Sequence, residues 1–495
     1  MNQSDIENVL HHLNYRWNLE ALALWKGDKV PFESHMIYAG YEGFISLDTL
    51  ASIDRLEGKA DKTRLRHALL DHYLQRSLLP HETEMRSWMR GASADIEGRK
   101  IYFRDIISWC QKESTFESRQ ILQKETGPLC KFLKPFALNY WNVLMEILIE
   151  DLGFNNYLDY CHEKKGIDYT YYYHFLKGFL ESTDDIYFRA MERWAKHEFR
   201  LPLKNLTRFD AIYLLGLGQF DTLFPQRDLE KLPLFFKYWD IDMHKLQGLS
   251  LELGKEEGKS SQAICFILQI PDEVYILMKP EGGWVDLETL WHELGHGLSA
   301  VFTSPHLTLV EREMATSFCL SETYAFLLQS ICLSIPFIVD YLGLERSIAE
   351  RLHYYKVLKE LAIFRRYAAK FIVEYEMFLE GDLENGENYS RLMARYTGFY
   401  YQPESHLFDL VPEFYCLDYV LAILAEPILE RYIKEKIGPD WIYKEETGEI
   451  LRNWWKQGNR YDIFEFLYKN RLGELDHEML LKRWKEVLDN GKYRF

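Results

Sequence analysis

The five consecutive residues His292-Glu293-Leu294-Gly295-His296 combine residue types and a spacing that suit metal binding and water activation. On a helix, side chains four positions apart lie on one face, so both imidazoles can contact the same ion. The glutamate that follows the first histidine then points toward a water molecule beside that ion, where it can act as a general base. Zinc suits such a site because it accepts an open coordination position and lowers the pKa of bound water to about 7.

An amphipathic helix with surface histidines is the alternative interpretation of this motif. The surrounding residues favour the metal site, because the other positions of the expected helix are apolar: Leu287, Leu290, Leu294, Leu298 and Val301. Two imidazoles on a buried helix would destabilise the fold unless they had partners. The sequence therefore predicts a zinc site at His292 and His296.

A catalytic zinc site needs a third protein ligand. Glu322 is the predicted ligand, because it lies in an apolar stretch, SFCLSETYAFLL, where a carboxylate needs a partner. Glu311 and Glu313 are the competing candidates. Acids at such positions are typical of a solvated first helical turn, where the helix dipole favours negative charge.

The elements that must position these residues are mostly helices. Helical spacing of apolar residues extends over most of residues 4–240. Residues 263–278, AICFILQIPDEVYILM, are rich in Ile, Val, Phe and Tyr and predict a β-hairpin. After the hairpin, Asp286 is the expected N-cap of a helix that reaches about residue 302, and further helices are expected over 311–334 and 412–437.

Composition excludes several classes of protein. The chain has 495 residues, a formal net charge of −17 and 47% hydrophobic residues, which is typical of a globular protein and unfavourable for binding nucleic acid. The seven cysteines include no C-x-x-C pair and predict free thiols in a reducing compartment. We expect a cytoplasmic protein, because no signal peptide is visible and no apolar stretch reaches the roughly 18–20 residues of a membrane helix.

The segment that begins YILMKPEGGWVDLETLWHELGHGLSA at residue 275 and reaches Glu322 resembles the thimet oligopeptidase and oligoendopeptidase F family of zinc peptidases. The resemblance rests on the glycine inside His-Glu-x-Gly-His, on the strand-loop-helix that leads into it, and on the later glutamate. It covers roughly residues 259–419, and the first ~180 residues match only in helical character. It implies that His292, His296 and Glu322 hold one zinc ion per chain, with Glu293 as general base.

The resemblance also includes residues 405–422, SHLFDLVPEFYCLDYVLA. It implies that His406, Tyr415 and Tyr419 donate hydrogen bonds to the oxyanion of the tetrahedral intermediate. A phenol suits this role, since it is a neutral donor in a cleft that excludes water. The alternative is that both tyrosines are core aromatics of an amphipathic helix and that His406 is a helix cap.

Three further features bear on substrate binding and on the metal. In the family the edge strand of the hairpin pairs with the extended peptide, which assigns residues 274–278 to that strand unless the hairpin is only structural. The usual glycine-rich stretch with tyrosine is replaced by KSSQA at 259–263, which leaves subsite specificity open. Gln329 stands where the family often has an acid, and its amide would accept the N–H of a ligand histidine unless it is a solvated helix position.

The expected fold is mainly α, a large helical bilobed body around a deep channel, with a small β-sheet or hairpin next to the zinc-binding helix. The expected division is an N-terminal helical lobe at 1–190 and a catalytic helical lobe at 191–495. The expected activity is zinc-dependent hydrolysis of internal bonds in short peptides, with neither nucleic acid nor membrane as a partner.

Two alternatives stay open. One is a zinc carboxypeptidase or dipeptidase of related helical fold, which would need a cationic pocket for the terminal carboxylate of the substrate. Arg312 and Lys279 are the candidates for that pocket. The other alternative is an inactive peptide-binding protein, although both histidines, Glu322 and the base Glu293 are present.

Overall fold

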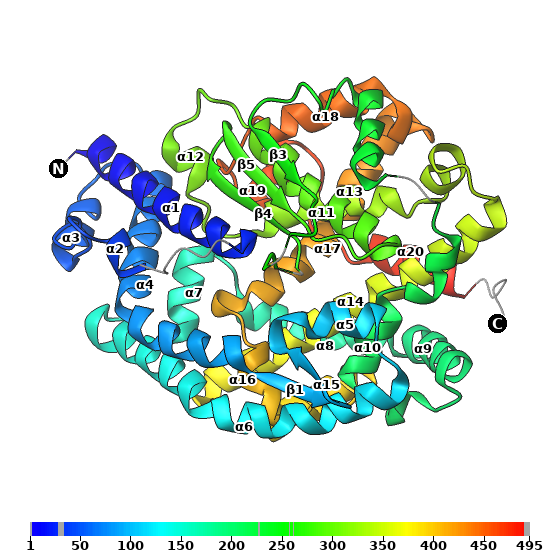
Figure 1. The fold of residues 1–495 in the computed structure, drawn as a ribbon. Helices are drawn as coiled ribbons and strands as arrows, with labels where there is room; N and C mark the ends of the chain where they lie inside the picture. Colours follow the sequence, from blue (N-terminus) through cyan, green and yellow to red (C-terminus); the bar gives the residue numbers. More distant parts are fainter. Residues whose placement is uncertain (1, 28–33, 226–227, 257, 261, 490–495) are drawn as a thin grey trace.

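The computed structural model describes residues 2–27, 34–225, 228–256, 258–260 and 262–489. Within these ranges helices predominate, and the strands form one two-stranded and one three-stranded sheet (Figure 1). The mainly α fold class predicted from the sequence is confirmed.

The helices that precede the His-Glu-Leu-Gly-His motif form most of the first half of the chain. They are α1 (Gln3–Lys26), α2 (Ser34–Ile37), α3 (Leu47–Ile53), α4 (Lys59–Gly91), α5 (Ile106–Lys112), α6 (Phe116–Glu146), α7 (Tyr157–Lys165), α8 (Tyr169–Ser182), α9 (Asp184–Phe199) and α10 (Arg208–Leu215). A short hairpin, β1 (Ser93–Ile96) and β2 (Arg99–Tyr102), separates α4 from α5. The sequence analysis did not predict this hairpin.

The second half of the chain begins with the motif helix. Its helices are α11 (Trp284–Val301), α12 (Leu309–Glu313), α13 (Cys319–Cys332), α14 (Arg346–Glu380), α15 (Gly386–Thr397), α16 (His406–Asp409), α17 (Tyr415–Ile437), α18 (Glu445–Trp455), α19 (Ile463–Lys469) and α20 (Glu478–Leu488). One hydrophobic core runs through both halves, from Ile6 and Leu10 in α1 to Trp484 and Leu488 in α20. The predicted boundary between residues 190 and 191 falls inside α9, and the division into lobes stays a prediction.

The three-stranded sheet lies beside α1 and α11 (Figure 1). The predicted hairpin is present as β4 (Ile264–Gln269) and β5 (Glu273–Leu277), which pair antiparallel. A third strand, β3 (Leu249–Glu252), pairs parallel with the other side of β5, so the strand order is β3-β5-β4. The expectation that residues 274–278 form an edge strand open to a peptide is therefore wrong, because β3 already occupies that side.

Helix boundaries differ from the expectations at three places. Gly283, rather than Asp286, precedes α11; Asp286 lies in the first turn and its carboxylate accepts a hydrogen bond from the Gly282 amide. The helix expected over 311–334 is two helices, α12 and α13, because Asp418 of α17 binds the intervening residues through the Ser317 hydroxyl (3.1 Å) and the Phe318 amide (3.3 Å).

The third difference is that α17 begins at Tyr415 rather than at residue 412. Glu413 and Phe414 have left-handed backbone conformations, with φ of 60° and 50°, which end the short helical turn before α17.

All seven cysteines are free, as expected, and six of them are buried. Among the described helices, none combines the length and the low charge that crossing a bilayer requires.

Candidate metal centre

Three predicted ligands converge between two neighbouring helices. His292 and His296 come from α11, and Glu322 comes from the first turn of α13. His292 Nε2 lies 3.3 Å from Glu322 Oε2, and His296 Nε2 lies 3.6 Å from Glu322 Oε1. One candidate ligand atom from each residue lies within 4.8 Å of the other two. The structure thus brings together the three side chains that the sequence singled out.

Gly295 sets how closely the two helices approach. A Cβ at this position would lie 2.4 Å from the Ala325 Cα and 2.8 Å from the Ala325 nitrogen, both backbone atoms of α13. Contacts this short do not occur between real side chains and backbone, so only glycine fits here. The glycine inside the motif therefore allows the imidazoles of α11 to reach the carboxylate of α13.

The two imidazoles are oriented by hydrogen bonds at their far nitrogens. His292 Nδ1 lies 2.8 Å from Gln329 Oε1, and His296 Nδ1 lies 2.7 Å from Ser321 Oγ. Because an amide oxygen only accepts, His292 donates through Nδ1, and its neutral form keeps the Nε2 lone pair for a cation. Gln329 thus makes the contact that the sequence analysis expected of it, and it holds the ring in the orientation that a metal ligand needs.

A buried chain of polar groups fixes Gln329 in turn. Gln329 Nε2 donates to Glu288 Oε1 (3.0 Å), and Lys359 Nζ from α14 donates to Glu288 Oε2 (2.5 Å). Sequence reasoning missed both Glu288 and Lys359. The available signal was Glu288 itself, an acid one helical turn before His292 on the same face of an apolar helix.

Glu322 stays ionised although it is buried. Burial alone would raise its pKa, but the two imidazoles and the Tyr415 hydroxyl hold the pKa of Glu322 below its usual value. Tyr415 Oη donates to Glu322 Oε1 at 2.5 Å. Burial disfavours the imidazolium of His292, yet the Glu322 carboxylate raises the pKa of His292 to about 9, whereas burial lowers the pKa of His296.

The donor set fits a divalent cation such as zinc. The buried Oε2 of Glu322 accepts no hydrogen bond from any described residue. A buried carboxylate oxygen without a donor is unfavourable unless a cation contacts it. Two imidazole nitrogens and one carboxylate are also the ligands of catalytic zinc sites that keep one position open.

Glu293 is half-buried and directly follows His292 on α11. Burial and then the charge of Glu293 raise the pKa of Cys265 in β4, and Glu293 also acts to raise the pKa of His292, so its carboxylate lies near both. No hydrogen bond joins its side chain to another residue in the described part of the chain. The carboxylate is thus available to a water molecule beside the cluster.

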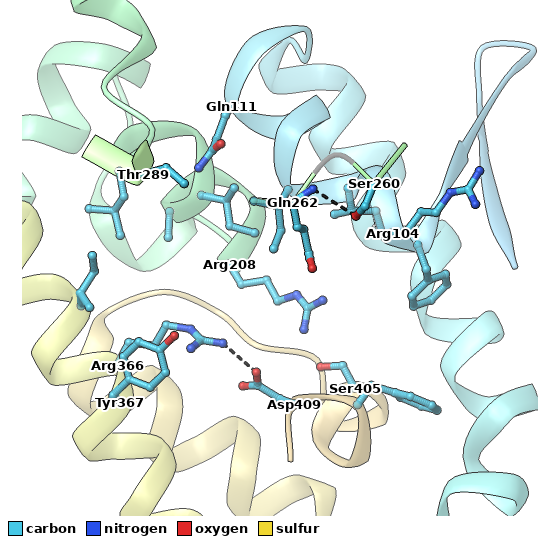
Figure 2. A pocket seen from close by; sticks show the side chains of 18 of the residues that line it. Arg104, Gln111, Arg208, Ser260, Gln262, Thr289, Arg366, Tyr367, Ser405 and Asp409 are labelled. Carbon is cyan, nitrogen blue, oxygen red and sulfur yellow. Dashed lines mark hydrogen bonds and ion pairs between the residues drawn. The ribbon is translucent and has the colours of Figure 1, made fainter. Parts of the chain in front are cut away.

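A cavity of about 1320 Å³ reaches His292 of this cluster. His292, Gln329 and Tyr419 contribute to its wall. Arg208 of α10 and Asp409 of α16 also line it (Figure 2). Its volume exceeds the roughly 300–1,000 Å³ of typical small-molecule pockets. The cavity can accommodate a ligand larger than a single amino acid.

The segment that replaces the family's glycine-rich stretch also reaches this cavity. Ser260 and Gln262 line it (Figure 2), and the Gln262 amide donates to Ser260 Oγ at 3.3 Å. Lys259 Nζ donates to the carbonyls of Glu252 (2.8 Å) and Gly254 (3.1 Å). Ser261 lies outside the described residues.

The three residues expected to act on the oxyanion lie in different surroundings. Tyr419 lines the cavity, and its ring is 6.4 Å from the ring of His292. The Tyr415 hydroxyl is engaged with Glu322. His406 is buried elsewhere, with Nδ1 2.7 Å from the Pro403 carbonyl and Nε2 3.0 Å from the Leu383 carbonyl. The structure therefore does not bring His406 to the cluster, because backbone carbonyls hold both of its nitrogens.

The competing candidates are also placed away from the cluster. Glu311 pairs with Arg460 (2.7 Å), and Glu313 lies 2.5 Å from His11 Nδ1. Arg312 and Lys279, the two candidates for a cationic pocket, are not among the described residues that line the cavity.

Comparison with known proteins places the fold. No protein-family model matches the sequence, and no curated protein sequence does. A solved structure described as an oligoendopeptidase F from Bacillus anthracis str. Ames matches 99% of this chain and 86% of its own, at 14% identity and a TM-score of 0.59. A structure of PZ peptidase A with an inhibitor matches 98% of this chain and 87% of its own, at 13% identity and a TM-score of 0.58. The chain therefore has the fold of these two structures.

Proposed function

We propose that this chain is a zinc-dependent peptidase of the thimet oligopeptidase and oligoendopeptidase F family, which hydrolyses internal bonds of short peptides. The observation that carries the proposal is the cluster of His292, His296 and Glu322, of which His292 lines a large cavity. The shared fold supports it, since the two matching structures are described as peptidases. The free thiols of all seven cysteines support a reducing compartment such as the cytoplasm.

In this proposal His292, His296 and Glu322 hold one zinc ion. Bound zinc would polarise the scissile carbonyl and lower the pKa of water. Glu293 takes a proton from the attacking water at its carboxylate and gives it to the nitrogen of the leaving amine. Gln329 and Ser321 keep the two imidazoles in the orientation that binding requires.

The two tyrosines have separate tasks in this proposal. Tyr415 holds the Glu322 carboxylate through its 2.5 Å hydrogen bond. Tyr419, which faces the cavity, donates to the oxyanion as the carbonyl becomes tetrahedral. Its phenol stays protonated throughout, because burial raises the pKa of Tyr419 well above its ordinary value.

Metal content and peptide hydrolysis, measured together, test the proposal. We expect about one zinc per chain, hydrolysis of a fluorogenic peptide, loss of activity on chelation and recovery when zinc is added back. Glu322→Ala should lower the zinc content, whereas Glu311→Ala should not, because Glu311 pairs with Arg460 outside the cluster. Full activity in the chelated protein, or full zinc content in Glu322→Ala, would contradict the proposal.

The products from a peptide blocked at both ends separate the proposed activity from the carboxypeptidase alternative. An endopeptidase cleaves such a peptide at an internal bond, whereas a carboxypeptidase leaves it intact because it needs a free terminal carboxylate. We expect internal cleavage, to be identified by mass spectrometry of the fragments.

A further inference from the structure

The cavity has the opposite charge from the molecule as a whole. The chain carries a net charge of −17, but the described residues that line the cavity include one acid, Asp409, and six basic residues. These six are Arg86, Arg90, Arg104, Arg208, Lys359 and Arg366. A cavity lined by one sign of charge favours ligands of the other sign.

Four of the six cations pair with acids of the protein. Arg366 pairs with Asp409 at 2.7 Å, Lys359 pairs with Glu288 at 2.5 Å, and Arg86 pairs with Glu82 at 2.5 Å. Arg104 pairs with its neighbour Asp105 at 3.7 Å. The other oxygen of Asp409 accepts a hydrogen bond from the Tyr389 hydroxyl at 3.1 Å. Asp409 therefore already has a partner at each carboxylate oxygen.

Arg208 differs from these four residues. Its side chain extends into the cavity above Asp409 (Figure 2), and in the described part of the chain no acid lies within ion-pair distance of its guanidinium. Its charge acts to lower the pKa of Asp409, which shows that the two groups are close enough to interact. The guanidinium therefore presents to the cavity a positive charge that has no ion-pair partner among the described residues.

The backbone that carries Arg208 is held firmly. Its amide donates to the Tyr400 carbonyl at 2.9 Å, and a capping box between Thr207 and Asp210 fixes the first turn of α10. Asp210 also forms a fully buried ion pair with Arg119 at 2.8 Å. The backbone of Arg208 is thus fixed in place, while its guanidinium is free to bind a ligand. Because the backbone is already ordered, the protein loses less conformational entropy when a ligand binds.

We propose that Arg208 binds a carboxylate of the peptide substrate in this cavity, and so determines specificity for peptides that carry one. This inference rests on the proposed peptidase function. A guanidinium matches a carboxylate through two parallel hydrogen bonds, and half-burial strengthens the contact relative to a fully solvated pair. The carboxylate comes either from the C-terminus of the peptide or from an Asp or Glu side chain.

Peptide affinity tests this inference separately from catalysis. Three probes share one sequence: a neutral peptide blocked at both ends, the same peptide with a free C-terminal carboxylate, and the blocked peptide with one internal glutamate. Their dissociation constants are measured with zinc-loaded, full-length protein carrying Glu293→Gln, so that cleavage does not interfere. Each is repeated with Arg208→Gln and with Arg90→Gln, a matched change at an exposed arginine on the cavity wall.

We expect one of the carboxylate peptides to bind more tightly than the neutral peptide, and Arg208→Gln to weaken its binding by roughly 10–100-fold. Arg90→Gln should change all three affinities by less than about threefold. The peptide that responds identifies the terminal carboxylate or the acidic side chain as the source. Equal affinity for all three peptides, or an equal effect of Arg208→Gln on all three, would overturn the inference. Failure of the proposed function would instead appear as absent turnover in the wild-type protein.

Discussion

At the scale of single residues, the two oxygens of the Glu322 carboxylate have different surroundings. Its Oε1 accepts from Tyr415, while its buried Oε2 lacks a hydrogen bond and faces His292 Nε2 at 3.3 Å. The carboxylate is thus anchored on one side and open on the side of the imidazoles. The first two predictions follow from this division.

Glu293→Gln is expected to leave zinc content unchanged and to lower kcat by about 10²–10⁴-fold, because glutamine keeps the shape of the side chain but cannot take a proton. Zinc content and kcat of the same preparation check this. Glu281→Gln, a change at an exposed acid before α11, is the control and should leave both values unaltered. Near-normal turnover in Glu293→Gln would remove the general-base assignment.

Tyr415→Phe and Tyr419→Phe are expected to affect different quantities, the first the affinity for zinc and the second the stabilisation of the transition state. Tyr415→Phe removes the hydrogen bond to Glu322 and should weaken zinc binding by about 10–100-fold. Tyr419→Phe should leave zinc affinity intact and lower kcat by roughly 10²–10³-fold with little change in KM. Zinc titration with a competing chelator and steady-state kinetics measure the two effects, and an exchange of the two results would exchange the roles.

The sequence predicted the residues whose position depends on local spacing. His292 and His296 share a face because they are four positions apart, and Glu322 was recognisable as an acid in an apolar helix. Arg208 was not recognisable, because its importance depends on the absence of a partner across the cavity. The place of His406 was not recognisable either, since sequence spacing does not show that the carbonyls of Pro403 and Leu383 bind its two ring nitrogens.

At the scale of secondary structure, the motif helix and the hairpin before it were predictable, and their neighbours were not. α11 and the pair β4–β5 follow from clear apolar periodicity. β3 pairs with β5 across a gap of about twenty residues, and the break between α12 and α13 depends on Asp418, a hundred residues later. Contacts of this range leave no local signal.

Helix α4 supplies a prediction about pH. His67 on this helix is buried, with neither ring nitrogen hydrogen-bonded to a described residue. Burial first, and then Lys164 and Arg66, lower the pKa of His67 to about 3, although Glu413 and Glu163 act in the opposite direction. The unfolded chain takes up this proton near pH 6.5 and the folded chain does not, so stability is lost as pH falls from 6.5 toward 3.

The free energy of unfolding of the wild type is therefore expected to fall, relative to that of His67→Gln, by about 1.4 kcal/mol per pH unit between pH 6 and 4. Urea unfolding at several pH values measures both proteins. His306→Gln, a change at an exposed histidine, should show the pH dependence of the wild type. Parallel curves for wild type and His67→Gln would contradict the assignment.

At the scale of the whole molecule, one core and a buried ion pair join the two halves of the chain. The core extends from α1 to α20, so no compositional boundary could have been read from the sequence. Lys165 at the end of α7 pairs with Asp418 of α17 at 2.8 Å, with side chains 2% and 0% exposed. Asp418 also binds Ser317 and the Phe318 amide, just before the helix that carries Glu322.

Lys165→Met is expected to destabilise the protein by about 3–5 kcal/mol, because it leaves the Asp418 charge buried without its partner. The double variant Lys165→Met/Asp418→Asn should recover part of that loss, since asparagine removes the charge and still accepts from Phe318. Thermal and urea unfolding of the single and double variants measure the effect. Lys434→Met, a change in a more exposed ion pair on α17, is the control and should alter stability by less than about 1 kcal/mol.

The close approach of α11 and α13 at Gly295 limits which amino acids can replace this glycine. The span from the imidazoles to Glu322 depends on the missing methyl group at 295, since a Cβ there would lie 2.4 Å from the Ala325 Cα and force the two helices apart. Alanine at 295 would touch neither the ion nor the peptide, and yet it would leave three intact ligands too widely separated to share one ion. Searches for inactivating changes should therefore include this position, although it contributes no atom to the chemistry.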